Sequence, residues 1–214
     1  MITVWGEGRG FRVVWLLEEM ELPYRLRPVD LLKGAEHDPE FLQVNPSGFI
    51  PALTDGDTTM VESVAIMEYL ATRYGPTPLA PRPEDPGYGL YLQFLHMGEA
   101  GLAMAMYVFA VSRMLAPEAE KDNWGGRLGR RVFDSRLRLV TDQLARTPYV
   151  AGDAFTAADI SVTYAIEFAW RQRGYTPDAP MRDYLARTTG RAGYTRAMDA
   201  CADTKAWVAG LALE

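Results

Sequence analysis

Residues 45–70 read NPSGFIPALTDGDTTMVESVAIMEYL, and this stretch decides the fold. Two short strand-like runs flank the tripeptide Asp55-Gly56-Asp57, and an Asp-Gly turn between such runs predicts a β-hairpin. From Ser63 the apolar residues return at helical spacing, which predicts a helix with Ser63 as its N-cap. The stretch therefore predicts a strand, a turn, a strand and a helix in close succession.

One residue in this stretch does not fit an ordinary strand. Pro51 stands among apolar residues, yet proline has no amide hydrogen to give to a sheet and belongs at an edge, a first strand position or a turn. If the Ile50–Pro51 bond is cis, the turn swings the Ile50 backbone out to face a peptide-like ligand. The alternative is a plain edge-strand proline, because only about 5–6% of X-Pro bonds in folded proteins are cis.

Composition limits the classes of protein to consider. The chain has 214 residues, of which 48% are hydrophobic and 23% charged, as in soluble globular proteins. A net charge of −6 argues against nucleic-acid binding. With one cysteine (Cys201) and two histidines (His37 and His96), we expect no disulfide and no metal site. No secretory signal opens the chain, and the longest apolar run (100–111) is shorter than the roughly 20 residues of a membrane span, so we expect a cytoplasmic protein that does not enter membranes.

A proline-rich segment divides the chain. Residues 75–87, GPTPLAPRPEDPG, carry five prolines and predict a stiff extended connector. We therefore expect a first domain at 1–76, a linker at 77–86 and a second domain at 87–214.

The two domains differ in their patterns. The first alternates in the order β-α-β-α-β-β-α, and the second reads as helix almost throughout. The fold class is thus α/β plus α. The expected strands are 2–5, 24–30, 51–54 and 58–61, and the expected helices are 10–22, 38–44, 63–74, 87–115, 123–147 and 155–172, the last opening with a capping box of Thr156 and Asp159.

The sequence WGEGRGF places glycines at positions 6, 8 and 10 between a strand and a helix. This is similar to the dinucleotide fingerprint GxGxxG, which would indicate a nicotinamide-dependent oxidoreductase. The third glycine is at the wrong spacing, because position 11 is Phe, and a hairpin follows where a nucleotide fold continues β-α-β. Two readings remain, a tight turn or a helix N-terminus that binds an anion or a thiolate.

Glu62 and Ser63 lie between a predicted strand and a predicted helix. They form either a plain N-cap or a site for a ligand that carries both a carboxylate and an ammonium group. In the second reading the Ser63 hydroxyl and the helix amides take the carboxylate, and Glu62 takes the amine.

Together these residues resemble the glutathione-binding core of the cytosolic glutathione transferases. The family pattern runs Asn-Pro-x-Gly-x-Val-Pro-x-Leu-x-Asp-Gly and then Glu-Ser-x-Ala-Ile-x-x-Tyr-Leu. It is matched here by Asn45, Pro46, Gly48, Ile50 (for Val), Pro51, Leu53, Asp55, Gly56, Glu62, Ser63, Ala65, Ile66, Tyr69 and Leu70. The resemblance extends over nearly the whole chain and is weakest at 112–147 and after 200.

The resemblance implies a thioredoxin-like N-terminal domain, an all-helical C-terminal domain and a homodimer. It implies glutathione as co-substrate, with its γ-glutamyl end on Glu62 and Ser63 and its cysteinyl backbone paired with Ile50 before a cis-Pro51. Phe49 stands where many relatives have Lys or Gln near the glycine end of glutathione, so that carboxylate is left to His37, with Lys33 and Arg12 as alternatives.

The loop before the first helix departs from the family pattern. Members usually have Tyr, Ser or Cys there to bind the glutathione thiolate or react with it, whereas residues 6–10 contain none of the three. The resemblance then leaves thiolate stabilisation to Arg9, to the amides of Arg9 and Gly10, and to the helix dipole. Glu7 opposes it, because a nearby carboxylate raises the pKa of a thiol.

The function expected from these features is a detoxifying transferase that joins the glutathione thiolate to an apolar electrophile. The second substrate would lie between the domains, against Met104, Met106 and Tyr107, since methionine-rich surfaces adapt to varied ligands. The alternative is a non-catalytic binding or scaffold protein with the same fold.

Overall fold

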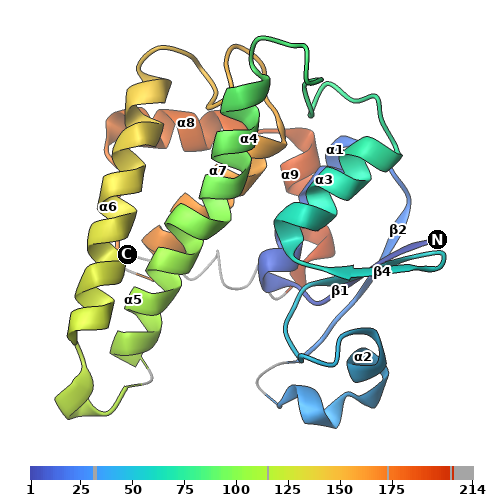
Figure 1. The fold of residues 1–214 in the computed structure, drawn as a ribbon, viewed down its shortest axis with the longest axis horizontal. Coiled ribbons are helices and arrows are strands. Elements are labelled where there is room, and N and C mark those ends of the chain that lie inside the picture. The colour runs from blue at the N-terminus through green and yellow to red at the C-terminus, as the bar shows by residue number, and fades with distance from the viewer. Residues whose placement is uncertain (31–32, 115, 173, 203, 205–214) are drawn as a thin grey trace. The chain divides into compact units, whose positions relative to one another are not determined.

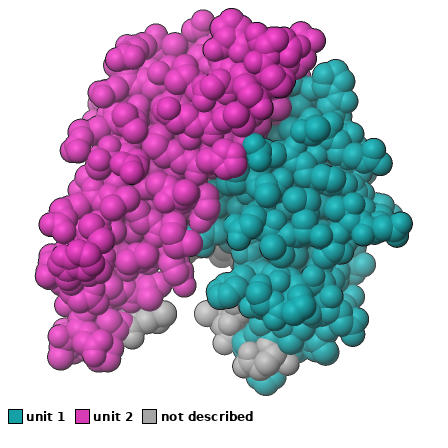
Figure 2. Space-filling view, viewed as in Figure 1, with its two compact units in different colours: residues 1–77, 190–214 teal, residues 78–189 magenta. Residues whose placement is uncertain are grey.

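The structure is a computed structural model, in which two compact units are recognised. Unit 1 comprises residues 1–77 and 190–214, and unit 2 comprises residues 78–189 (Figure 2). The structure describes residues 1–30, 33–114, 116–172, 174–202 and 204.

Unit 1 contains a mixed β-sheet. Its elements are β1 (Ile2–Trp5), η1 (Gly8–Gly10), α1 (Phe11–Glu19), β2 (Tyr24–Arg27), η2 (Ala35–His37), α2 (Pro39–Val44), β3 (Ala52–Asp55), β4 (Thr58–Val61), α3 (Ser63–Arg73) and α9 (Ala192–Ala200). Among the described residues the sheet has four strands in the order β2-β1-β3-β4. β1 pairs in parallel with β2 and antiparallel with β3, which pairs antiparallel with β4. The predicted β-α-β-α-β-β-α order and the thioredoxin-like fold are confirmed.

Helices cover both faces of this sheet. α1 and α3 lie on one side and α2 lies on the other (Figure 1). Side chains alternate along a strand, so neighbouring residues of β1 serve different faces. Trp5 packs with Phe41 of α2 and Ala52 of β3 in one buried cluster, whereas the Val4 side chain lies near Gly10 at the start of α1.

The predicted hairpin is confirmed. Asp55 pairs with Thr58 across the turn, and Gly56 has φ +58°, a value that favours glycine. The hydroxyls of Tyr69 and Tyr74 donate to Oδ2 of Asp55 at 3.0 and 2.6 Å. These donors, Tyr74 first, lower the pKa of Asp55 below its usual range. They also tie α3 to the hairpin.

The prediction that Ser63 caps α3 was wrong by one residue. Glu62 occupies the N-cap position, since its carbonyl accepts a hydrogen bond from the amide of Ile66 at 2.9 Å. Glu62 has φ +70°, outside the helical region, and Ser63 is the first helical residue. The chain therefore turns sharply at Glu62 before the helix begins.

Unit 2 is a helical bundle, as predicted. Its elements are α4 (Tyr88–Met97), the π-helical η3 (Gly98–Ala103), α5 (Met104–Met114), η4 (Glu118–Glu120), α6 (Trp124–Leu144), α7 (Ala157–Arg171) and α8 (Ala179–Thr189). The first three run on without a break. In the described part of the chain, this 27-residue stretch is the one helix that is long and apolar enough to cross a membrane by length and composition. Half of its apolar window is buried, against α7 and α6, as in a core helix.

The C-terminal end divides differently from the predicted domain at 87–214. The described residues from 190 onward group with unit 1, because α9 packs against α1. The ring of Tyr194 meets those of Phe11 and Trp15 edge-on, with centroids 5.6 and 4.9 Å apart. Residues 75–87, all of which the structure describes, contain no helix or strand, as expected of the linker.

Candidate functional site

The glycine loop packs directly on the proline turn. Gly6 has φ +84°, and a Cβ added there would lie 2.3 Å from Cγ2 of Ile50. A Cβ added at Gly10 would lie 3.2 Å from Cβ of Pro51. Only glycine allows this approach at position 6, so the glycine there follows from packing on this turn. The antiparallel β3 that comes next in the sheet is not the parallel strand of a dinucleotide-binding fold.

Asn45 shapes the loop that leads into this turn. Its buried side-chain amide donates to the carbonyl of Phe49 at 2.5 Å, and its Oδ1 accepts from the amide and the hydroxyl of Ser47 at 3.1 and 2.6 Å. The Ile50–Pro51 bond that follows is cis, and β3 begins only at Ala52. Pro51 therefore precedes the strand instead of interrupting its ladder.

Glu62 and Ser63 form the start of α3. Glu62 is exposed, and within the described residues its carboxylate has no hydrogen-bond or ion-pair partner. Ser63 is only 3% exposed, and no described residue accepts or donates a hydrogen bond at its hydroxyl. A helix N-terminus attracts anions through its free amides and its dipole. This helix start thus presents a carboxylate and a hydroxyl that the described chain does not use.

Arg9 and Gly10 lie where strand β1 has ended and helix α1 begins. Arg9 is half-buried within η1, and the amide of Gly10 donates to the carbonyl of Glu7 at 2.9 Å. Gly10 occupies the N-cap position of α1 and contacts Pro51, so the N-terminus of α1 lies beside the proline turn. The two predicted features, glycine loop and proline turn, are brought together by the fold.

Glu7 is bound by a residue that is remote from it in the sequence. It is 8% exposed, and its Oε2 accepts hydrogen bonds from the amide and the hydroxyl of Thr204, at 2.9 and 3.0 Å. The two residues are 197 positions apart. No local pattern in the sequence could have indicated this contact.

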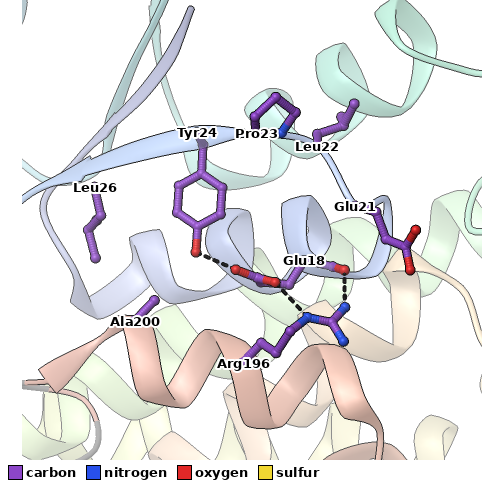
Figure 3. A pocket seen from close by; sticks show the side chains of 8 residues that line it. All are labelled: Glu18, Glu21, Leu22, Pro23, Tyr24, Leu26, Arg196 and Ala200. Carbon is purple, nitrogen blue, oxygen red and sulfur yellow. Dashed lines mark hydrogen bonds and ion pairs between the residues drawn. The ribbon is translucent and has the colours of Figure 1, made fainter.

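Tyr24, the tyrosine nearest the glycine loop in sequence, is engaged elsewhere. It lines a groove of about 650 Å³ in unit 1 and donates to Glu18 at 2.7 Å, while Arg196 of α9 also binds Glu18 (Figure 3). Burial, and then the bond to Glu18, raises the pKa of the Tyr24 hydroxyl. Glu18 belongs to the C-terminal end of α1, so Tyr24 serves the opposite end of the helix from Gly10.

The three candidates for the glycine carboxylate differ in exposure. His37 is exposed on η2, and η2 contacts the loop at Gly48, where an added Cβ would lie 3.1 Å from that of Ala35. Lys33 is exposed and forms an ion pair with Asp30 at 3.3 Å. Arg12 is fully buried, so it presents no surface to a ligand.

The candidates for the second substrate also separate by burial. Met104 and Tyr107 are 45% and 43% exposed, whereas Met106 is completely buried. A Cβ added at Gly174 would lie 2.0 Å from the Met106 methyl, which shows how tightly Met106 is packed inside unit 2. Met106 therefore cannot lie on a substrate-facing surface, and the prediction for it is corrected.

A metal site was not expected. Across the part of the chain that the structure describes, no three His, Cys, Asp or Glu side chains are grouped so as to hold a metal ion. Cys201 is buried.

Comparison with known proteins decides the family. The model of the glutathione S-transferase N-terminal domain matches residues 2–72. Glutathione S-transferase 3 of Schizosaccharomyces pombe is 30% identical over 191 residues, which cover 82% of this chain and 76% of the relative. The chain belongs to the glutathione S-transferase family. GstB of Escherichia coli K12, another glutathione S-transferase, is 31% identical over 173 residues, covering 76% of this chain and 80% of that protein.

Solved structures of glutathione transferases share the fold. One is the enzyme URE2P6 of Phanerochaete chrysosporium in complex with oxidised glutathione, with a TM-score of 0.80 and 25% identity over 92% of this chain and 94% of that one. Another is the theta-class enzyme of Xanthomonas axonopodis pv. citri with glutathione bound, with a TM-score of 0.76 and 26% identity over 92% and 96% of the two chains. The fold predicted from the sequence is thus that of proteins crystallised with glutathione.

Proposed function

We propose that this protein is a glutathione transferase that binds glutathione in unit 1 and adds its thiolate to an apolar electrophile. The observation that carries the proposal is the start of α3. Glu62 and Ser63 stand there without partners among the described residues, in a unit whose glycine loop packs on the Ile50–Pro51 turn. Membership of the family supports glutathione as the ligand.

In the proposed complex the γ-glutamyl end of glutathione lies at α3. Its carboxylate accepts hydrogen bonds from the Ser63 hydroxyl and the first amides of the helix, and its ammonium group pairs with Glu62. The cysteinyl backbone pairs with the N–H and C=O of Ile50, and the glycine carboxylate is bound by His37. Each polar end of the peptide then meets a side chain that can bind it.

The thiol in this complex lies at the N-terminus of α1. The amide and the guanidinium of Arg9 and the dipole of α1 lower its pKa, because each favours the anion. The Gly10 amide already donates to the Glu7 carbonyl, so Gly10 contributes by bringing the start of α1 beside Pro51. The thiolate lone pair forms a bond to the electrophilic carbon, and the displaced group leaves with the electron pair of the bond that breaks. No metal takes part in this scheme.

The second substrate is an apolar molecule that meets Met104 and Tyr107, the exposed members of the predicted set. Homodimerisation and a cytoplasmic location are part of the proposal, and resemblance to the cytosolic glutathione transferases supports them.

A second candidate function is a non-catalytic binding or scaffold role on the same fold. It is favoured by residues 6–10, Gly-Glu-Gly-Arg-Gly, which lack the tyrosine, serine or cysteine that the family usually places there. The two candidates differ in whether the protein makes the bound thiol more acidic.

The test is a conjugation assay with glutathione and a chlorinated nitrobenzene, run with the parent, Arg9→Ala and Arg146→Ala. Arg146 is an exposed arginine on the surface of unit 2 and is the matched control. We expect Arg9→Ala to lower kcat roughly tenfold, the loss of one charged donor at the thiolate, and Arg146→Ala to match the parent. A parent that neither binds nor conjugates glutathione would favour the second candidate.

A further inference from the structure

The last part of the described chain contacts both ends of the region around α1. At the C-terminal end of α1, Arg191 pairs with Glu19 at 2.7 Å and Arg196 pairs with Glu18 at 2.8 Å. Beyond α9, Thr204 reaches the glycine loop at the other end and binds Glu7. One segment therefore contacts the C-terminal end of α1 and also the glycine loop that precedes the N-terminus of α1.

The contact at Glu7 is a buried and specific one. A carboxylate with little exposure is costly unless hydrogen bonds satisfy it, and bonds to a charged acceptor are stronger than neutral ones. Both bonds that Thr204 donates go to the same oxygen, Oε2, one from the backbone and one from the side chain. Glu7 is thus held in a single orientation by a residue remote in sequence.

Holding Glu7 also fixes the loop around it. Glu7 stands between Gly6 and Gly8, and its carbonyl accepts from the amide of Gly10 at the start of α1. Gly6 and Gly10 touch Ile50 and Pro51, so a shift of Glu7 displaces the loop against the proline turn.

We infer that Thr204 is a positioning residue for the thiolate site. This inference rests on the proposed function, because the loop and the turn are the groups proposed to meet the cysteinyl part of glutathione. Thr204 acts through Glu7: it binds the carboxylate, keeps the loop seated on the Ile50–Pro51 turn and keeps the carboxylate from moving towards the thiolate. The C-terminal segment thereby belongs to the active site without touching the substrate.

The decisive variants are Thr204→Val, which removes the hydroxyl donor but keeps the shape, and Thr204→Ser, which restores it. Thr195→Val is the matched control, since Thr195 is an exposed residue of α9 whose hydroxyl makes only a long bond to Arg191 within the helix. We expect Thr204→Val to lower kcat and the thiolate absorbance of bound glutathione about fivefold, the loss of one hydrogen bond, with KM for glutathione nearly unchanged. Thr204→Ser should recover most of both, and Thr195→Val should equal the parent.

A double-mutant cycle shows whether Thr204 acts through Glu7. The double variant of Glu7→Ala and Thr204→Val should lose no more kcat than Glu7→Ala alone, because the partner of Thr204 is already gone. Hydrogen–deuterium exchange of the unliganded parent and Glu7→Ala tests the contact itself. The peptide that contains Thr204 should exchange faster in the variant.

The outcomes separate this inference from the proposed function. The positioning role is overturned, and the proposed function stands, if the parent conjugates glutathione and Thr204→Val has the same kcat as the parent. The same conclusion holds if the losses in kcat of the two single variants simply add in the double variant. A parent that binds no glutathione overturns the proposed function, and the positioning role with it. The inference is supported if kcat and thiolate absorbance fall in Thr204→Val, recover in Thr204→Ser, and the losses in kcat are not additive in the double-mutant cycle.

Discussion

Two helix N-termini in this molecule are built in opposite ways. Helix α7 of unit 2 begins with a closed capping box, in which Oδ2 of Asp159 accepts from the amide of Thr156 at 2.9 Å. Its other oxygen accepts from the amide of Val150 and the hydroxyl of Tyr184, at 3.0 and 3.1 Å. Helix α3 of unit 1 begins at Glu62 and Ser63, where the side chain at the N-cap makes no capping bond.

The start of α7 has a structural role, whereas we propose that the start of α3 has a role in binding. The carboxylate at α7 is fully buried and satisfied by its own chain, so that helix start stabilises unit 2 and has nothing left for a ligand. The carboxylate at α3 is exposed, and its backbone is held at φ +70°. The positive φ and the unused carboxylate of Glu62 are the observations that support our proposal of a ligand site at α3.

Removing the carboxylate at α7 should have the largest effect. Asp159→Ala removes the acceptor of four buried hydrogen bonds, so we expect a loss of about 3 kcal/mol or more in the free energy of unfolding, which lowers Tm by roughly 10 °C. Thermal unfolding measures it, with Asp153→Ala, an exposed aspartate of the same loop, as the control that should change little. Equal melting temperatures for the two variants would show that the capping box of α7 does not stabilise the protein.

The same carboxylate predicts a pH dependence of stability. Burial raises the pKa of Asp159 to about 6 against hydrogen bonds that lower it, while the unfolded chain ionises near its ordinary 3.8. Between about pH 4 and 6 the folded protein binds a proton that the unfolded chain has released, so stability falls as pH rises through this window, by on the order of 2 kcal/mol. Urea unfolding should show that the difference in free energy of unfolding between the parent and Asp159→Asn shrinks as the pH rises over that range. A constant difference would contradict the buried, titrating carboxyl.

The smallest effect is expected at α3, where stability and binding should move in opposite directions. Glu62→Gly removes the strain of a non-glycine residue at positive φ and should stabilise the free protein by about 1 kcal/mol. It should also weaken the binding of glutathione, because the carboxylate is lost. Glu62→Ala loses the same carboxylate but keeps the backbone conformation, so it should weaken glutathione equally without the gain in stability. Thermal unfolding and calorimetric titration of the two variants separate the contributions. If Glu62→Gly binds as tightly as the parent, Glu62 does not take part in the site.

The local parts of the fold could be predicted from the sequence. The Asp-Gly hairpin, the capping box at Thr156 and Asp159 and the proline-rich division each depend on residues close together in the chain. The choice of Met106 as an adaptable surface methionine failed, because the segment around it is apolar on nearly all sides and has no polar stripe to mark the exposed face.

Contacts between distant segments could not be predicted. The packing of α9 on α1 joins residues more than 170 positions apart, as in the pair of Arg191 and Glu19, and depends on the tertiary fold. The same holds for Gly6 on Ile50, whose glycine the sequence could only attribute to a turn or an anion site. In each case the cause is a neighbour that no local pattern specifies.

The central claim is that the start of α3 binds glutathione, and a calorimetric titration of the parent, Ser63→Ala and Ser135→Ala tests it most directly. Ser135 is a partly exposed serine of α6 in unit 2 and serves as the matched control. We predict that the parent and Ser135→Ala bind alike and that Ser63→Ala binds at least about tenfold more weakly, the loss of one hydrogen bond to a charged carboxylate, with Tm almost unchanged. Equal binding by all three proteins, or none by the parent, would contradict the claim.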